Sequence, residues 1–274
     1  MRYVHLCLLL ALFCFFPIFV YGGDSTIGGS QNIHTEEVEY AAGGVPLKGY
    51  LAYDKSIKGK RPGVLVVHEW WGHNEYARRR ARMLAKLGYT ALAVDMYGSG
   101  KTADHPDDAT RFMNEVLENM ERGEARFNAA LGILKRHATT DPERIGAIGY
   151  CFGGGVVLHM ARSGADLRGV ASFHGSLGSS HTPEPGSVKA KVLVLHGADD
   201  RLIPPQQVEA FKREMEKARV DYRFIAYPGA MHSFTNPDAD RFAERFNMPL
   251  GYNEKADRLS WREMKDFFEE VLTE

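Results

Sequence analysis

The sequence predicts an α/β fold in which helices cover both faces of a mostly parallel, doubly wound sheet. Short apolar runs alternate with amphipathic helical patterns along the chain, two alternating segments flank a Gly-Gly turn, and a glycine-rich turn directly follows one apolar run. Alternation of strands and helices is typical of parallel sheets with helices on both sides. The chain has 274 residues. Without the predicted N-terminal leader roughly 250 would remain, which is enough for one large domain with a buried core.

The elements follow from these patterns in order along the chain. A β-hairpin is expected over 37–41 and 45–53, because apolar and polar residues alternate on both sides of Gly43-Gly44. Apolar runs predict strands over 64–68, 90–94, 144–149, 168–174, 191–196 and 222–227. Amphipathic patterns predict helices over 74–87, 107–137 (one helix or a pair), 153–162, 204–218 and 254–272. Residues 175–189 are rich in Gly, Ser and Pro without apolar periodicity, so no cap domain is expected.

The first 23 residues have the pattern of a signal peptide. Arg2 is positive, residues 6–20 form an apolar run, and small residues follow near position 22. An uncleaved N-terminal anchor is the alternative, because the run is nearly long enough to span a bilayer. We therefore expect an exported protein, periplasmic or secreted, with a connector over 24–35 and a catalytic domain over 36–274. Cys7 and Cys14 lie in the leader, which leaves one thiol in the mature chain.

The charge balance argues against nucleic acid or an anionic membrane surface as partner. The formal net charge is −1, and the one basic cluster, residues 78–82, has no interleaved aromatic side chains on which bases would stack. This cluster is interpreted as the solvated face of a helix. The expected partner is a small-molecule substrate, with no membrane contact beyond a possible N-terminal anchor.

The most specific motif is residues 149–155, Gly-Tyr-Cys-Phe-Gly-Gly-Gly, directly after the apolar run 145–148. A strand that ends in Gly-x-nucleophile-x-Gly and turns at once into a helix is the nucleophile elbow of the α/β-hydrolase fold. The glycines allow the tight turn. The nucleophile position holds Cys151, so the motif predicts a thiol nucleophile.

A base and an acid follow Cys151 in the order that this fold uses. His232 lies in a loop after the last predicted strand, and Asp199 and Asp200 follow the strand before it. Either aspartate could orient the base. His196 is interpreted as a structural histidine at a strand end, because it precedes the acid in the chain. A nucleophile, a base and an orienting acid are the requirements of nucleophilic acyl transfer.

The second motif is residues 68–73, His-Glu-Trp-Trp-Gly-His, at the end of the first central strand. Its histidines lack the His-Glu-x-x-His spacing of a zinc site, and neither a metal nor an organic cofactor is expected. In the α/β-hydrolase fold this loop and the residue after the nucleophile each supply a backbone N–H to the oxyanion hole, which predicts the amides of Trp70 and Phe152. A carboxylate at Glu69 would hold a nearby Cys151 thiol neutral.

Together these stretches resemble the dienelactone hydrolase (carboxymethylenebutenolidase) family from about residue 36 to the C-terminus. The matching runs are His-Glu-Trp-Trp-Gly at 68–72, Asp-Met-Tyr-Gly at 95–98, the elbow at 145–154, the Asp-x-x-x-Pro run at 200–204 and His-Ser-Phe at 232–234. The resemblance implies a triad of Cys151, His232 and Asp200 that hydrolyses an ester or lactone through a thioacyl-enzyme. It also implies that Glu69 contacts the resting thiol and swings away when substrate binds.

The chain departs from the family pattern where two arginines would grip a substrate carboxylate. Those places hold residues 98–101, Gly-Ser-Gly-Lys, and Asn236. Lys101 would replace one arginine in part, as a point charge, and Trp70, Trp71 and Tyr97 are candidates for the substrate pocket, although core packing accounts equally well for Trp71. We therefore expect a small ester, lactone or thioester other than dienelactone. The alternative is a non-catalytic ligand-binding protein on the same fold.

Overall fold

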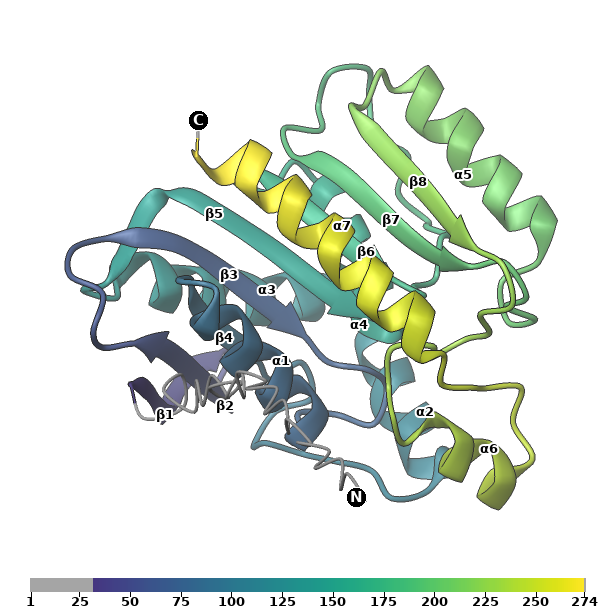
Figure 1. Cartoon of the computed structure of the whole chain (residues 1–274), viewed down its shortest axis with the longest axis horizontal. Coiled ribbons are helices and arrows are strands. Elements are labelled where there is room, and N and C mark those ends of the chain that lie inside the picture. The colour runs from purple at the N-terminus through teal and green to yellow at the C-terminus, as the bar shows by residue number, and fades with distance from the viewer. Residues whose placement is uncertain (1–31, 274) are drawn as a thin grey trace, which may run out of the picture.

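The computed structural model describes residues 32–273, and the predicted leader, residues 1–23, lies outside them. Over this range the chain forms eight strands and seven helices (Figure 1). The strands are β1 (Ile33–Ala42), β2 (Val45–Asp54), β3 (Arg61–Val67), β4 (Thr90–Val94), β5 (Thr140–Tyr150), β6 (Gly169–Phe173), β7 (Lys191–Gly197) and β8 (Tyr222–Tyr227). The helices are α1 (Glu75–Lys86), α2 (Pro106–Leu117), α3 (Met120–Arg136), α4 (Phe152–Arg162), α5 (Pro205–Lys217), α6 (Ala239–Phe246) and α7 (Glu254–Thr273).

All eight strands belong to one sheet in the order β1-β2-β4-β3-β5-β6-β7-β8. The hairpin β1–β2 is antiparallel, and β2 pairs with β4 in antiparallel orientation. The strands β4, β3, β5, β6, β7 and β8 are parallel to one another. From β3 the chain adds β4 on one side and then β5, β6, β7 and β8 on the other, so the strand order reverses beside β3, as in doubly wound folds. The carboxyl ends of the parallel strands therefore meet at one edge of the sheet.

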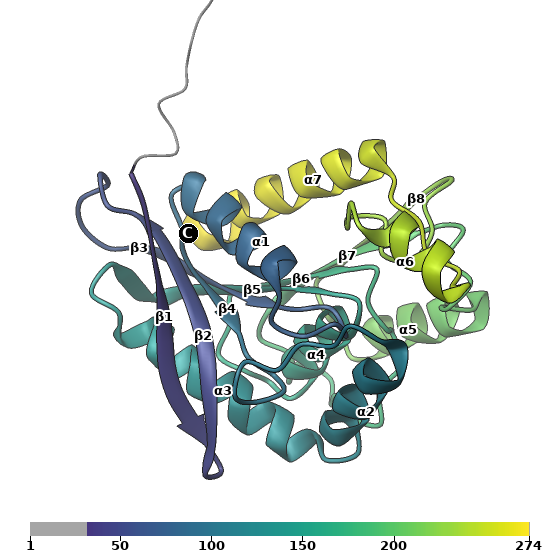
Figure 2. The same ribbon diagram turned by 90° about the horizontal axis from the view of Figure 1, so that it is seen from below.

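Helices cover both faces of the sheet, and each face has its own apolar core. Figure 2 shows α1 and α7 on one side and α3, α4 and α5 on the other. The core on the first side joins Leu84 of α1 and Phe268 of α7 to the strands. The core on the second side joins Phe127 of α3, Val157 of α4 and Phe211 of α5 to the opposite face. The predicted α/β-hydrolase fold with a mostly parallel, doubly wound sheet and an N-terminal hairpin is confirmed.

Residues 107–137, predicted as one helix or a pair, form the pair α2 and α3, because the Asn119 side chain accepts a hydrogen bond from the Arg122 amide and caps a new helix. The structure differs from the predicted elements in two other places. Residues 33–35, assigned to the connector, are part of β1 and pair with β2. The eight-residue helix α6 was not predicted. Between β6 and β7, residues 175–189 form neither helix nor strand.

The basic cluster on α1 is not uniformly solvated, which corrects the interpretation of residues 78–82. Arg80 lies four residues from both Tyr76 and Leu84, so it shares the buried face of α1 with them. Its side chain is 1 % exposed and bonds to Asp257 Oδ1 at 2.6 Å and to the Thr235 carbonyl at 2.7 Å. A buried guanidinium needs such partners, so Arg80 is part of the interior that supports the loop around residue 235.

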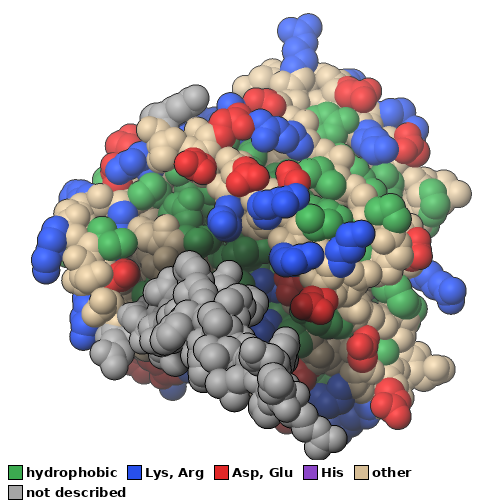
Figure 3. All heavy atoms as spheres, viewed as in Figure 1, with side chains coloured by type: hydrophobic (Ala, Val, Ile, Leu, Met, Phe, Trp, Pro, Cys, Tyr) green, Lys and Arg blue, Asp and Glu red, His purple; other side chains and the backbone are tan. Residues whose placement is uncertain are grey.

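The described surface shows neither a single-sign charge patch on the face of Figure 3 nor a membrane-spanning helix. Lys, Arg, Asp and Glu side chains are interspersed over the face drawn in Figure 3. Within residues 32–273, every helix is too short or too polar to cross a bilayer.

Candidate active site

Cys151 occupies a strained turn between β5 and α4. Its backbone has φ 53° and ψ −115°, a left-handed region that residues with a side chain rarely adopt. The turn is tight because a Cβ on Gly149 would lie 2.0 Å from the Gly153 carbonyl oxygen, and one on Gly153 would lie 2.3 Å from that of Val67. The Cys151 amide donates to the Phe173 carbonyl at 3.0 Å. Glycine at both positions thus allows the sharp turn that presents the thiol beyond the sheet edge.

Two neighbouring strand ends bring a histidine and an aspartate to Cys151. His232 follows β8 and Asp200 follows β7, and their Nδ1 and Oδ2 atoms are 2.8 Å apart. Cys151 also acts on the His232 ring, and its influence raises the pKa of the imidazole. Asp200 is buried, whereas Asp199 is exposed. His196 lies within β7 with its ring 5.5 Å from that of Phe224. Of the two candidate acids, Asp200 is therefore the one that contacts the imidazole.

The environment of His232 favours a charged imidazole. Burial alone would lower its pKa, but the charge of Cys151 and the hydrogen bonds to Asp200 and Cys151 outweigh burial and raise the pKa of His232 well above its ordinary value. A raised pKa makes the ring a stronger acceptor for a proton from the thiol. His232 is thus hydrogen-bonded to Asp200 and is also influenced by Cys151.

The loop after β3 and the start of α4 each place one candidate oxyanion donor beside Cys151. The amides of Trp70 and Phe152 donate no hydrogen bond to any other described residue, and both residues line the cavity at Cys151. The Tyr97 hydroxyl donates to the Trp70 carbonyl at 2.9 Å, and the Gly153 amide donates to the His68 carbonyl at 3.1 Å. These bonds hold the loop against the first turn of α4. An oxyanion hole at these amides stays a prediction.

Glu69 contacts a different partner from the one that the resemblance implies. Its Oε2 accepts a hydrogen bond from Asn236 Nδ2 at 2.6 Å, and no hydrogen bond joins it to Cys151 within residues 32–273. Burial raises the pKa of Glu69, although hydrogen bonds from Asn236 and Ser233 and the charge of His232 act in the opposite direction. The structure thus shows the Glu69 carboxylate hydrogen-bonded to Asn236 and not to the resting thiol.

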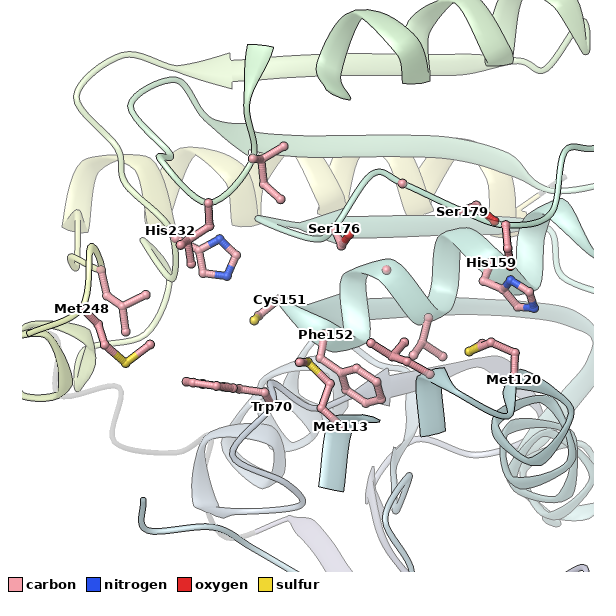
Figure 4. Close-up of a pocket in the computed structure, with 18 residues that line it drawn as sticks. Trp70, Met113, Met120, Cys151, Phe152, His159, Ser176, Ser179, His232 and Met248 are labelled. Atoms are coloured by element: carbon pink, nitrogen blue, oxygen red, sulfur yellow. The ribbon is translucent and has the colours of Figure 1, made fainter. Parts of the chain in front are cut away.

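A cavity of about 550 Å³, here named the Cys151 cavity, opens at the thiol. Its volume lies within the ordinary range for small-molecule sites. Figure 4 shows the Cys151 sulfur between two ends, with Trp70 and Met248 toward one and Met120 and His159 toward the other. The lining is mostly apolar and comes from α2, the start of α3, α4, the segment around Leu250 and the loops after β3, β6 and β7, with the loop after β6 adding Ser176, Ser179 and Ser180.

Three residues assigned to the substrate pocket do not line the Cys151 cavity. Trp71 is 1 % exposed and stacks on Phe242 with ring centroids 4.4 Å apart. Tyr97 is also buried and turns its hydroxyl to the loop. Lys101 is exposed, with its Nζ 5.3 Å from the centre of the Phe112 ring. Core packing explains the two aromatic residues, and of the predicted pocket aromatics Trp70 alone lines the cavity.

Sequence reasoning missed the walls of the cavity. Met113, Leu117 and Met120 line it from α2 and the start of α3, and Met248 and Leu250 line it from the segment beside His232. Apolar residues at helical spacing look the same whether they face a core or a pocket, so the sequence carried no signal to separate the two.

His68 and His73 flank this loop as buried neutral side chains. His68 Nε2 accepts from the Met96 amide at 3.3 Å, which leaves Nδ1 to donate to the Glu69 carbonyl at 2.5 Å. Burial lowers the pKa of both histidines to about 4. Over the described range no three His, Cys, Asp or Glu residues are grouped so that they could hold a metal ion.

Stability is expected to fall as the pH drops from 6.5 to 4, because both histidines bind protons more weakly when folded. The unfolded chain takes up their protons near 6.5 and the folded chain near 4, so the loss amounts to on the order of 3 kcal/mol for each. Replacing His73 with leucine should flatten this dependence in urea unfolding at pH 7 and pH 4.5. His34→Leu, at an exposed site, is the control. Equal pH slopes for the His73 variant and the parent would contradict the assignment.

The fold and this arrangement of strand-end residues define the chain as an α/β-hydrolase. It belongs to the dienelactone hydrolase family, whose model matches residues 47–272, and the resemblance stated from the sequence is confirmed. Protein usf of Aquifex pyrophilus is 29 % identical over 240 residues, which cover 86 % of this chain and 98 % of that protein.

Solved structures agree with this family assignment. The structure of m3DLH is 36 % identical with a TM-score of 0.83 and covers 88 % of this chain and 99 % of its own. The dienelactone hydrolase-like promiscuous phosphotriesterase P91 from metagenomic libraries is 33 % identical with a TM-score of 0.80, at the same coverage. The chain is thus a dienelactone-hydrolase-like hydrolase.

Proposed function

We propose that the protein hydrolyses small esters or lactones through a thioacyl intermediate on Cys151, with His232 as general base and Asp200 as the group that orients it. The observation that carries this proposal is that Cys151 and His232 line one cavity of about 550 Å³, with His232 hydrogen-bonded to the buried Asp200 and its pKa raised by Cys151. A nucleophile, base and orienting acid in this contact are the requirements of covalent acyl transfer.

The first half of the reaction forms the thioester. His232 accepts the thiol proton through the nitrogen that faces Cys151, and the thiolate attacks the carbonyl carbon of the ester. The negative oxygen of the tetrahedral intermediate accepts hydrogen bonds from the Trp70 and Phe152 amides. The carbon–oxygen bond then breaks, and His232 returns its proton to the departing alkoxide, which leaves as the alcohol.

The second half regenerates the thiol. A water molecule takes the place of the alcohol, and His232 removes one of its protons while the oxygen attacks the thioester carbon. The carbon–sulfur bond breaks, the acid departs, and the proton on His232 returns to the sulfur. Asp200 holds the imidazole with Nδ1 protonated in both halves, so the nitrogen that faces Cys151 is free to accept each proton.

The position of Glu69 bears on how the thiol is activated. With its carboxylate hydrogen-bonded to Asn236, Glu69 leaves the sulfur to His232 before any substrate arrives. Activation then needs no charged group on the substrate. Glu69 in this proposal tunes the nucleophile through its charge beside His232.

Export of the protein through a signal peptide at residues 1–23 stays a prediction.

The proposal is tested with p-nitrophenyl acetate and a panel of small lactones, following turnover and intact mass together. Chain lacking the predicted leader should hydrolyse the acetate and gain one acetyl group, mapped to Cys151, in the steady state. A neutral phosphotriester belongs in the panel because P91 is named a phosphotriesterase. Ligand binding without turnover or adduct would replace the proposal with a non-catalytic binding protein.

A further inference from the structure

We propose that the Cys151 cavity selects uncharged esters whose larger, apolar group extends along α4 from Cys151 toward His159. The inference rests on the proposed function and names its substrate class. It depends on four features of the cavity, which are its apolar walls, its length, the pairing of the polar group at its far end, and the exposed apolar residues at its mouth.

Most side chains that line the cavity are apolar, including Met113 and Leu117 of α2, Met120 of α3 and Val156 of α4. The lining also includes the hydroxyl groups of Ser176, Ser179 and Ser180, while the His232 ring is already paired with Asp200. Among the described residues that line it, none is Lys, Arg, Asp or Glu. A substrate carboxylate placed among the methionine and leucine side chains would lose its hydration without gaining a cationic partner, which is costly.

The cavity is long enough for a medium-length chain. Cys151 precedes the first turn of α4, and His159 lies eight residues further along, which corresponds to about 12 Å at the helical rise per residue. Gly155 lines the cavity between them, and its missing side chain keeps the space open opposite Ser176. An extended octanoyl group matches this length.

His159, the titratable side chain at the far end, is already paired with a carboxylate. His159 Nε2 lies 2.7 Å from Glu124 Oε1, so any positive charge on its ring is matched by a carboxylate of this chain. Ser163 contacts the same carboxylate at 3.3 Å. The far end therefore ends the apolar channel without offering an unpaired cation to a substrate anion.

The mouth of the cavity is also apolar. Leu117 and Leu202 both line the cavity and are 48 % and 44 % exposed, two of the four large hydrophobic side chains that are exposed within residues 32–273. They come from α2 and from the loop between β7 and α5. Exposed apolar residues that gather at a pocket mark a ligand-binding surface, and here they suit the passage of an apolar group.

The first test compares three p-nitrophenyl esters, the acetate, the octanoate and the monoester of suberic acid. The suberate monoester matches the octanoate in length but ends in a carboxylate. We expect kcat/KM to be about 100-fold higher for the octanoate than for the acetate, and about 100-fold higher for the octanoate than for the suberate. Equal values for octanoate and suberate, or a preference for the suberate, would overturn the proposal.

The second test introduces a cation near the far end of the cavity. Met120→Arg should lower the ratio of octanoate to suberate kcat/KM by at least about 10-fold, because the guanidinium would meet the terminal carboxylate. Leu87→Arg adds the same group at an exposed position outside the cavity and should leave the ratio as in the parent chain. Equal shifts in both variants would show that general surface charge, and not the cavity, sets the preference.

A binding measurement separates this inference from the proposed reaction. Calorimetry with the Cys151→Ala chain compares octanamide with its carboxylated counterpart suberamate, so no turnover is needed. Tighter binding of octanamide supports the substrate class even if the parent chain shows no thioacyl adduct. Equal or weaker binding of octanamide would refute it even if acetate hydrolysis through Cys151 is demonstrated.

Discussion

Replacing Cys151 with alanine is expected to lower kcat for p-nitrophenyl acetate by about 10⁴-fold or more. The thiol is the atom that would bond to the acyl carbon, and its removal leaves His232 with no nucleophile to activate. The binding cavity and the two candidate oxyanion amides remain, so KM should change little. Stopped-flow release of p-nitrophenol, combined with intact mass, measures the loss of turnover and of the acyl adduct in one experiment.

Cys151→Ser is the matched control for this change. Serine keeps the size and the strained backbone of the turn, at φ 53°, but it offers a hydroxyl where the parent has a thiol. We expect measurable turnover through an ester adduct, well below that of the parent chain, and unfolding temperatures within a few degrees of one another for both variants. Parent-like turnover in the alanine variant would remove Cys151 from the nucleophile's role.

Replacing Asp200 with asparagine is expected to lower kcat by about 10³- to 10⁴-fold. Asp200 Oδ2 accepts the Nδ1 proton of His232 at 2.8 Å, which keeps the other ring nitrogen free to take the thiol proton. An asparagine amide can donate to Nδ1 instead, and the ring would then carry its proton on the wrong side. The loss of the carboxylate charge also removes one of the causes that raise the pKa of His232.

The neighbouring residue provides a close control for Asp200. Asp199→Asn removes the same charge one residue away, at an exposed position that makes no side-chain contact with His232. It should keep kcat within about twofold of the parent, because an exposed charge acts weakly through solvent. The pH–rate profiles of the two variants complete the comparison, since only Asp200→Asn should shift the limb that reports on His232. Similar losses in both variants would contradict the assignment.

The strand-end residues could be predicted because their signals are local. Gly149 and Gly153 lie on either side of Cys151 because the tight turn leaves no space for a Cβ at either position. The same steric limit holds wherever this turn occurs. His232 and Asp200 follow successive parallel strands, so their order along the chain implies that they meet at one edge of the sheet. The sheet could be predicted for the same reason, because each strand and each helix shows its own local spacing of apolar residues.

The remaining features depend on contacts between segments far apart in the chain. Glu69 binds Asn236 across 167 positions, and nothing near either residue indicates this pairing. Arg80 lies within a run of arginines, yet only Asp257 on α7 and the aromatic rings around it explain why it is buried. The walls formed by Met113 and Met120 look like core positions in any helical pattern. Such features need the packed structure.

The reacting groups and the cavity walls belong to different parts of the architecture. Cys151, Asp200 and His232 follow strands of one hydrogen-bonded sheet, whereas Met113, Leu117 and Met120 of the wall belong to the helical pair α2–α3. Mutations in that pair can accumulate without moving the sheet edge, so substrate range and chemistry are separately evolvable. A library confined to residues 113, 117 and 120 would therefore be the natural starting point for redirecting the enzyme toward new esters.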